Sequence, residues 1–203
     1  MDYQIIEDRL NQKGINYHDY LNNLIEDIIE TKPDSLDEKA RKKFEIKRLN
    51  LQRSARIMKT YKVSNNLKEE IKKINEPQTW MVITENWCGD SAQNLPYLAL
   101  MAEENPNINF RIILRDSNPD IMDQFLTNGT RSIPILVAFD TRGNELFRWG
   151  ARPKVVQKLF LQWKAEGIVN PELYKKLHLW YSRNKGQAIE SEFLEILKTV
   201  EQD

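Results

Sequence analysis

The chain has 203 residues, of which 40% are hydrophobic and 30% are charged, and its formal net charge at pH 7 is zero. This composition is typical of a globular protein, and it excludes a disordered chain and a protein built as a whole to bind polyanions. The chain has one cysteine, no apolar segment of the ~20 residues that a membrane span needs, and neither a basic nor an apolar leader. We therefore expect a cytoplasmic protein with no intramolecular disulfide and no membrane partner.

Helices are expected in the first third of the chain. Apolar residues recur at helical spacing over residues 17–29. Ser35 and Glu38 form a capping box that opens a second helix, expected to reach residue 61. Ser64 caps a third, shorter helix.

Charge is distributed unevenly over these helices. Residues 1–38 contain ten acidic and three basic side chains, whereas residues 39–62 contain ten basic and one acidic. Clustered lysine and arginine can neutralise phosphates, but no nucleic-acid-binding motif accompanies this run. Because the acidic segment offers an internal partner of opposite charge, we expect no nucleic-acid partner.

Strands and helices alternate in the middle of the chain. The expected elements are a doubly buried strand at 79–84, a helix at 89–104, a strand at 109–114, a short helix that starts at Pro119 and is closed by Asn128-Gly129, a hairpin of strands at 135–139 and 145–149, and a helix from Pro153 to near Gly167. This order predicts a mixed sheet with helices on both faces. We expect an N-terminal helical extension at 1–76, a core at 77–166, and a C-terminal helical extension at 167–203 packed on the core.

The single cysteine, Cys88, lies where the first strand of this core passes into a helix. The free N–H groups of a first helical turn stabilise a thiolate, whereas the carboxylate of Asp90 in the same turn repels one. A lone cysteine is most often a small buried apolar residue, but the flanking Trp87, Gly89 and Ser91 are unlike a core segment. The balance between the helix N-terminus and Asp90 decides whether this sulfur is reactive.

The segment Trp87-Cys88-Gly89-Asp90-Ser91 resembles the Trp-Cys-Gly-Pro-Cys active site of the thioredoxin family. Ile133-Pro134 resembles the cis-proline loop of that family, and Gly143 and Gly150 match glycines of its last two strands. The likeness covers residues 79–165 and is greatest to a bacterial thioredoxin-like branch with helices before the core and Trp-Cys-Gly-Asp at the site. It implies a thioredoxin-like α/β fold, with a mixed sheet flanked by helices and helical extensions at both ends.

The resemblance implies roles at the matched positions. Cys88 is the attacking thiol, and Pro134, in cis, faces it across the site. The backbone of Ile133 pairs with an extended substrate segment, and Trp87 shapes the rim, with Gly89 beside the thiol.

Three positions depart from the family pattern. Ser91 stands where a thioredoxin has its second cysteine, so it cannot resolve a mixed disulfide. Asp90 replaces the proline, and Val82 occupies the place of a buried aspartate that assists proton transfer in many thioredoxins. Arg131 is either a partial counter-charge to Asp90 or a solvated loop arginine, and we expect the second.

These observations predict monothiol thiol–disulfide exchange through Cys88. The expected partner is a protein or a small thiol that carries a disulfide or thiol adduct. No cofactor is expected, and a low-molecular-weight thiol is expected to act as the reductant. One alternative is a redox-inactive binding module that uses the groove beside the cis-proline. Another is a monothiol site that holds an iron–sulfur cluster together with a thiol cofactor, although Trp87 and Asp90 are unlike such sites. No metal site is expected, because His18 and His178 lack metal-spaced neighbours.

Overall fold

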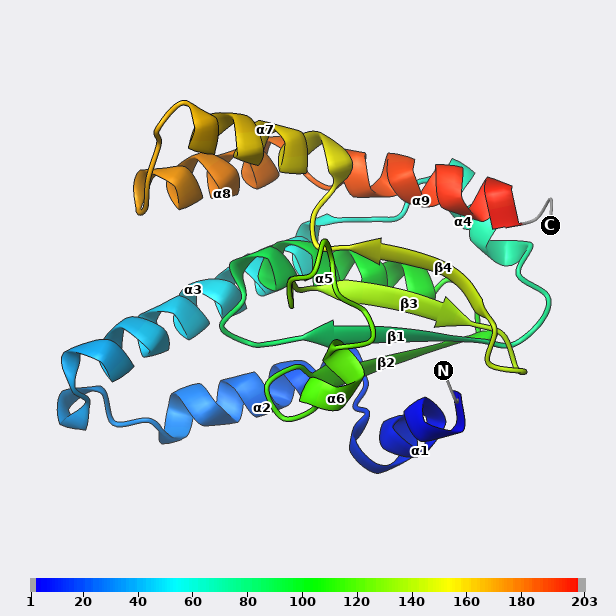
Figure 1. Cartoon of the computed structure of the whole chain (residues 1–203), viewed down its shortest axis with the longest axis horizontal. Helices are drawn as coiled ribbons and strands as arrows, with labels where there is room; N and C mark the ends of the chain where they lie inside the picture. The colour runs from blue at the N-terminus through cyan, green and yellow to red at the C-terminus, as the bar shows by residue number, and fades with distance from the viewer. Residues whose placement is uncertain (1–2, 201–203) are drawn as a thin grey trace.

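The computed structural model describes residues 3–200, and its centre is a four-stranded mixed sheet of order β2-β1-β3-β4 (Figure 1). The strand β1 (Gln78–Thr84) runs parallel to β2 (Ile108–Leu114) and antiparallel to β3 (Ile135–Phe139). The strand β4 (Glu145–Gly150) pairs antiparallel with β3 and forms one edge. The expected mixed sheet is confirmed.

Helices flank this sheet on both sides and extend beyond it (Figure 1). Their bounds are α1 (Tyr3–Lys13), α2 (Tyr17–Glu30), the 3₁₀ helix η1 (Pro33–Ser35), α3 (Glu38–Thr60), α4 (Asn65–Lys72), α5 (Gly89–Ala102), α6 (Pro119–Met122), α7 (Lys154–Ala165), α8 (Glu172–Asn184) and α9 (Gln187–Val200). None of the helices within residues 3–200 is long and apolar enough to cross a membrane.

The two faces of the sheet are covered by different helices, because alternate side chains of a strand point to opposite faces. Trp80 and Val82 of β1 are fully buried in a cluster with side chains of α4, α5 and α9. Met81 and Ile83 are fully buried on the other face, in a cluster with side chains of α1 and α6. Burial on both faces explains why this strand is apolar without alternation.

The last three helices divide between two clusters. The ring of Phe193 in α9 contacts the rings of Trp80, Phe147 and Trp149, so α9 covers the same sheet face as α5. The helices α7 and α8 pack on each other in a separate cluster that includes Phe160 and forms a hairpin beyond the sheet (Figure 1). The helix that packs against β4 is therefore α9 rather than α7.

Some expected helix boundaries are wrong. The residue that caps α3 is Asp37, whose side chain accepts from Ala40 N at 2.7 Å, whereas Ser35 lies in η1 and donates to Lys32 O. The helix α6 ends at Met122, and Asn128-Gly129 instead form the turn of the short bridge between Thr127 and Thr130. At the first boundary the Ser35 hydroxyl bonds a carbonyl three residues back, so Asp37 caps the helix in its place.

The helix α1 was not expected from the sequence pattern, because only Ile6 and Leu10 of its residues are buried. These two side chains pack against the sheet, and the guanidinium of Arg9 forms an ion pair with Asp120 at 2.8 Å. Tertiary contacts therefore hold a helix whose amphipathic pattern is weak.

The helix α3 packs along α5 and approaches the loop before it. Ser54 Oγ donates to Ala92 O at 3.3 Å, and Asn50 Nδ2 donates to Asn86 O at 2.9 Å. Since the backbone of Asn86 lies two residues before Cys88, these contacts join the N-terminal extension to the strand-to-helix turn that carries the thiol.

Candidate functional site

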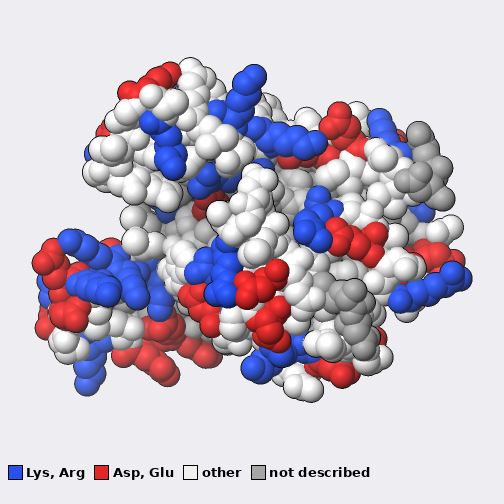
Figure 2. Space-filling view, viewed as in Figure 1, with Lys and Arg blue, Asp and Glu red and all other residues white. Residues whose placement is uncertain are grey.

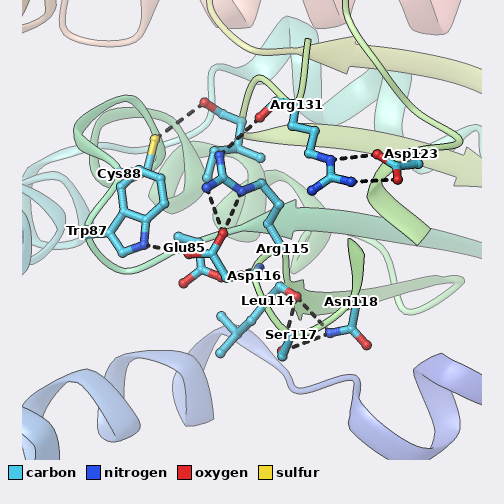
Figure 3. A network of polar contacts seen from close by, with 11 residues as sticks. Glu85, Trp87, Cys88, Leu114, Arg115, Asp116, Ser117, Asn118, Asp123 and Arg131 are labelled. Atoms are coloured by element: carbon cyan, nitrogen blue, oxygen red, sulfur yellow. Dashed lines mark hydrogen bonds and ion pairs between the residues drawn. The ribbon is translucent and has the colours of Figure 1, made fainter. Parts of the chain in front are cut away.

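Cys88 is the N-cap residue of α5, directly after the turn that follows β1. Its side chain is 8% exposed, and Sγ donates to the carbonyl oxygen of Ile133 at 3.4 Å (Figure 3). The Ile133–Pro134 peptide bond is cis. The sulfur and the loop at residues 133–134 therefore face each other across the site.

The surroundings of Cys88 favour the protonated thiol. Burial is the largest cause and the negative charge of Asp90 the second, and together they raise the pKa of Cys88 to about 11. Hydrogen bonds from the Ser91 hydroxyl and from the backbone N–H groups of Ser91 and Asp90 act in the opposite sense. The first turn of α5 thus stabilises a thiolate, but less strongly than burial and Asp90 disfavour it.

Asp90 itself is buried, and it binds two groups from the C-terminal half of the chain. Its carboxylate forms an ion pair with Arg152 Nη2 at 2.8 Å and accepts from the hydroxyl of Tyr181 at 2.7 Å. Asn94 Nδ2 donates to the same tyrosine oxygen at 3.1 Å. Asp90 therefore joins α5 to the α7–α8 hairpin, and Arg152 balances its charge.

Arg131 does not take part in this charge balance. Its guanidinium donates two hydrogen bonds to the carboxylate of Asp123, at 2.6 and 2.7 Å, and both side chains are exposed (Figure 3). The interpretation of Arg131 as a solvated loop residue is confirmed, and Arg152 is the cation beside Asp90.

Ser91 lies behind the sulfur, in the core. It is fully buried, and its hydroxyl oxygen accepts from Thr84 Oγ1 at 2.6 Å. This bond joins the end of β1 to the first turn of α5. The position that a second cysteine would occupy therefore carries a hydroxyl that is held in place and can donate to the sulfur.

Trp87 lies at the rim of the site and is 36% exposed. The guanidinium of Arg115 lies over its ring at 4.7 Å from the centroid, and its Nε1 donates to Asp116 Oδ2 at 3.2 Å (Figure 3). The backbone N–H of Asp116 donates to Glu85 at 2.7 Å, and burial raises the pKa of that glutamate. This network fixes the indole beside the thiol.

The sulfur opens into a groove between two helices that lie outside the sheet. Its volume is about 810 Å³, and we call it the α3–α8 groove. The side chains that define it come from α3, from the Cys88 turn and from α8: Ile46, Leu49, Arg53, Cys88, Tyr174 and His178. Figure 2 shows the hollow between the arm of α2 and α3 and the hairpin of α7 and α8. Ile133 and Pro134 are both buried and do not line it.

His178 occupies the groove beside the thiol because residue 89 is glycine. A Cβ on Gly89 would lie 2.8 Å from Cε1 and 3.0 Å from Nε2 of His178, closer than a side chain can approach. Burial, followed by the charges of Arg53 and Arg152, lowers the pKa of His178 to about 4. The imidazole is therefore neutral at pH 7.

The structure brings Trp87, Cys88, Gly89 and Asp90 together along the groove and places Ser91 beneath them. Arg53, Arg152, His178 and Tyr181 were not expected at the site. Arg152 could have been predicted from two signals. A buried carboxylate in the first turn of α5 needs a cation beside it. Arg152 follows the edge strand β4, whose neighbour β3 begins directly after the cis-proline loop. For the α8 residues we find no local signal.

Within residues 3–200, no group of three or more His, Cys, Asp and Glu side chains lies close enough to hold a metal ion. The groups that contact the Cys88 sulfur are the Ser91 hydroxyl, the backbone N–H groups of Asp90 and Ser91, and the carbonyl oxygen of Ile133.

Comparisons with known proteins agree with this geometry. A family model described as thioredoxin matches residues 38–165. A protein of unknown function from Pseudomonas aeruginosa is 22% identical over 74% of this chain and 85% of its own, with a TM-score of 0.57. An HIV epitope scaffold is also 22% identical, over 74% of this chain and 86% of its own, with a TM-score of 0.54.

At such identity these two structures show the fold alone. No curated protein matches the chain. The family model extends from the start of α3 to the end of α7, so it includes the Cys88 turn, the cis-proline loop and the whole sheet. The fold is the thioredoxin-like α/β fold, and the chain belongs to the thioredoxin family.

Proposed function

We propose that this protein performs monothiol thiol–disulfide exchange through Cys88. The observation that carries the proposal is the position of the sulfur at the N-cap of α5, where it lines the α3–α8 groove. Backbone N–H groups and the Ser91 hydroxyl stabilise the thiolate there, and Arg152 balances the charge of Asp90.

The exchange proceeds in two balanced steps. The Cys88 thiolate attacks one sulfur of a disulfide, so that a Cys88–substrate bond forms while the substrate bond breaks and the second sulfur leaves as a thiolate. Because Ser91 cannot attack the mixed disulfide, a low-molecular-weight thiolate does so, forms a disulfide with the substrate and releases Cys88 as a thiolate. In each step one thiolate replaces another at a disulfide bond, so the two steps together need no further oxidant or reductant.

A second candidate is a binding module whose thiol does not react. It is favoured by the pKa of about 11 and by the 8% exposure of Cys88, which keep the sulfur protonated and partly shielded at neutral pH. In that case the groove binds its ligand without forming a bond to sulfur.

Mixed-disulfide formation in the folded protein distinguishes the two candidates. Reduced protein is incubated with glutathione disulfide or cystine between pH 7 and pH ~10, and the adduct is measured by intact mass, with Cys88→Ser as the control. Exchange predicts an adduct that forms faster as the pH rises and that an added thiol removes. If adduct forms only in unfolded protein, exchange is excluded and the binding module remains.

A further inference from the structure

We propose that the α3–α8 groove is a binding site for a small molecule with an aromatic or similarly apolar body and a carboxylate, the carboxylate lying on Arg53 and the body reaching Cys88. Where the ligand is a disulfide or thiol adduct, this names the substrate class of the exchange and rests on the proposed function. Binding itself does not require the sulfur to react.

The dimensions of the groove fit a small molecule. Its volume of about 810 Å³ lies in the range of ligand sites, roughly 300–1,000 Å³. Cys88 is 8% exposed, and its sulfur is accessible through the groove between α3 and α8. A flat protein surface therefore cannot contact the sulfur, whereas a narrow ligand can. The backbone beside Pro134 offers no alternative approach, because Ile133 and Pro134 are buried and the Ile133 carbonyl accepts from the thiol.

The lining of the groove is apolar at positions where helix surfaces are usually polar. Ile46 and Leu49 of α3 are 43% and 47% exposed, and Tyr174 of α8, on the opposite side, is 43% exposed. With Trp87 at the rim, apolar side chains from three separate segments converge on one hollow. Such converging exposed apolar groups mark ligand or partner sites, because covering them removes apolar surface from water.

The charge in the groove selects an anion. Arg53 is half-buried, donates to Asn50 Oδ1 at 2.8 Å, and has no carboxylate within ion-pair distance among residues 3–200. Burial, and then the nearby Arg56, lower the pKa of Arg53, while the negative charge of Asp90 acts in the opposite sense. Asp90 also lines the groove, but Arg152 and Tyr181 already bind its carboxylate.

Basic side chains surround the entrance as well. Lys175 of α8 lines the groove, and its ammonium lies 3.7 Å from the carboxylate of Glu172 in an exposed pair. Figure 2 shows lysine and arginine atoms on both sides of the hollow. A ligand carboxylate could therefore form a charge-assisted hydrogen bond with the Arg53 guanidinium, which has no ion-pair partner among residues 3–200.

A pair of disulfide probes tests the substrate class. Dithiobis-nitrobenzoate carries an aromatic ring and a carboxylate on each sulfur, whereas dithiodipyridine is aromatic and uncharged, and each releases a coloured thiol. Rates are compared for the native chain, Arg53→Gln, and Arg48→Gln, a control on the same helix whose guanidinium pairs with Glu45 outside the groove. Arg53→Gln is expected to slow the carboxylate probe about tenfold and the neutral probe little. Equal effects on both probes, or equal effects of the two variants, would overturn the proposal.

Binding without chemistry separates this proposal from the exchange reaction. Calorimetric titration of Cys88→Ser with naphthoate is expected to show saturable binding that Arg53→Gln weakens about tenfold and Arg48→Gln does not. Naphthylmethanol, the uncharged counterpart, is expected to bind more weakly. If naphthoate binds but no disulfide reacts with folded protein, the exchange fails and the site remains. If disulfides react but naphthoate does not bind, the site fails and the exchange remains.

Discussion

Replacing Asp90 by asparagine is expected to make Cys88 more reactive at neutral pH while it destabilises the fold. The carboxylate is the second-largest cause, after burial, of the raised pKa of the thiol. Asparagine keeps an acceptor for the Tyr181 hydroxyl but removes the negative charge, and it leaves Arg152 without its partner. Reactivity and stability should therefore change in opposite directions.

The size of each effect follows from the geometry. If removing the charge lowers the thiol pKa by about one pH unit, the thiolate fraction rises about tenfold, but a less basic thiolate is about threefold less nucleophilic. The net gain in reaction rate is then about threefold. The lost pair joins side chains that are 14% and 8% exposed, and breaking a pair this buried costs about 3 kcal/mol.

The assay is the rate of Cys88 alkylation by iodoacetamide at pH 7, together with urea unfolding of the same samples. Arg152→Met provides the decisive comparison, because it keeps the Asp90 side chain and removes the cation that pairs with it. That variant should also be less stable, but its thiol pKa should rise and its alkylation should slow. Arg131→Met, which removes an exposed pair with Asp123, should change neither quantity appreciably.

Either of two results would contradict control of Cys88 by the charge of Asp90. If both Asp90→Asn and Arg152→Met accelerate alkylation, local unfolding rather than charge controls access to the sulfur. If Asp90→Asn is less stable yet alkylates no faster, the carboxylate does not control the acidity of Cys88.

Three further predictions concern the same turn. Gly89→Ala should cost about 1–2 kcal/mol in urea unfolding, since its Cβ would lie 2.8 Å from His178 Cε1, and unchanged stability would contradict that packing. The pKa of His178 is lowered to about 4, so as the pH falls the unfolded chain binds a proton at this residue before the folded chain does. The free energy of unfolding should therefore be constant above pH ~6.5 and fall by at most about 3 kcal/mol toward pH 4. The variant His178→Gln should show a smaller fall. Ser91→Cys should form a disulfide with Cys88 on oxidation, and persistence of two free thiols in a thiol titration would show that the buried position cannot approach the sulfur.

The sequence predicts most of the core because its elements follow strong local patterns. The strand at 79–84 lacks alternation because both of its faces are buried, and the 17–29 helix has a clear apolar stripe. The cysteine at the start of α5 follows from the same reasoning, since a strand followed by a helix places the intervening turn at the edge of the sheet. By contrast, α1 depends on two buried side chains and on contacts with distant segments, which no local pattern contains.

The site could be predicted only in part, because its electrostatics depend on contacts between distant segments. Tyr181 and Asp90 are 91 residues apart in the sequence, yet they form one of the shorter hydrogen bonds near the thiol. The α3–α8 groove likewise needs helices from both extensions. The pattern around Cys88 predicted the carboxylate that opposes the thiolate, but not the arginine that balances it.

The pH dependence of Cys88 alkylation in folded protein tests the central claim most directly. With a pKa of about 11, about one thiol in ten thousand is ionised at pH 7, roughly 300-fold fewer than for a free cysteine. The rate should therefore rise about tenfold per pH unit up to pH ~10 without levelling off, be unaffected by urea too dilute to unfold the chain, and vanish in Cys88→Ser. A rate that levels off near or below pH ~8.5 would contradict the raised pKa of the thiol. A thiol that reacts only after unfolding would contradict a working nucleophile in the folded protein.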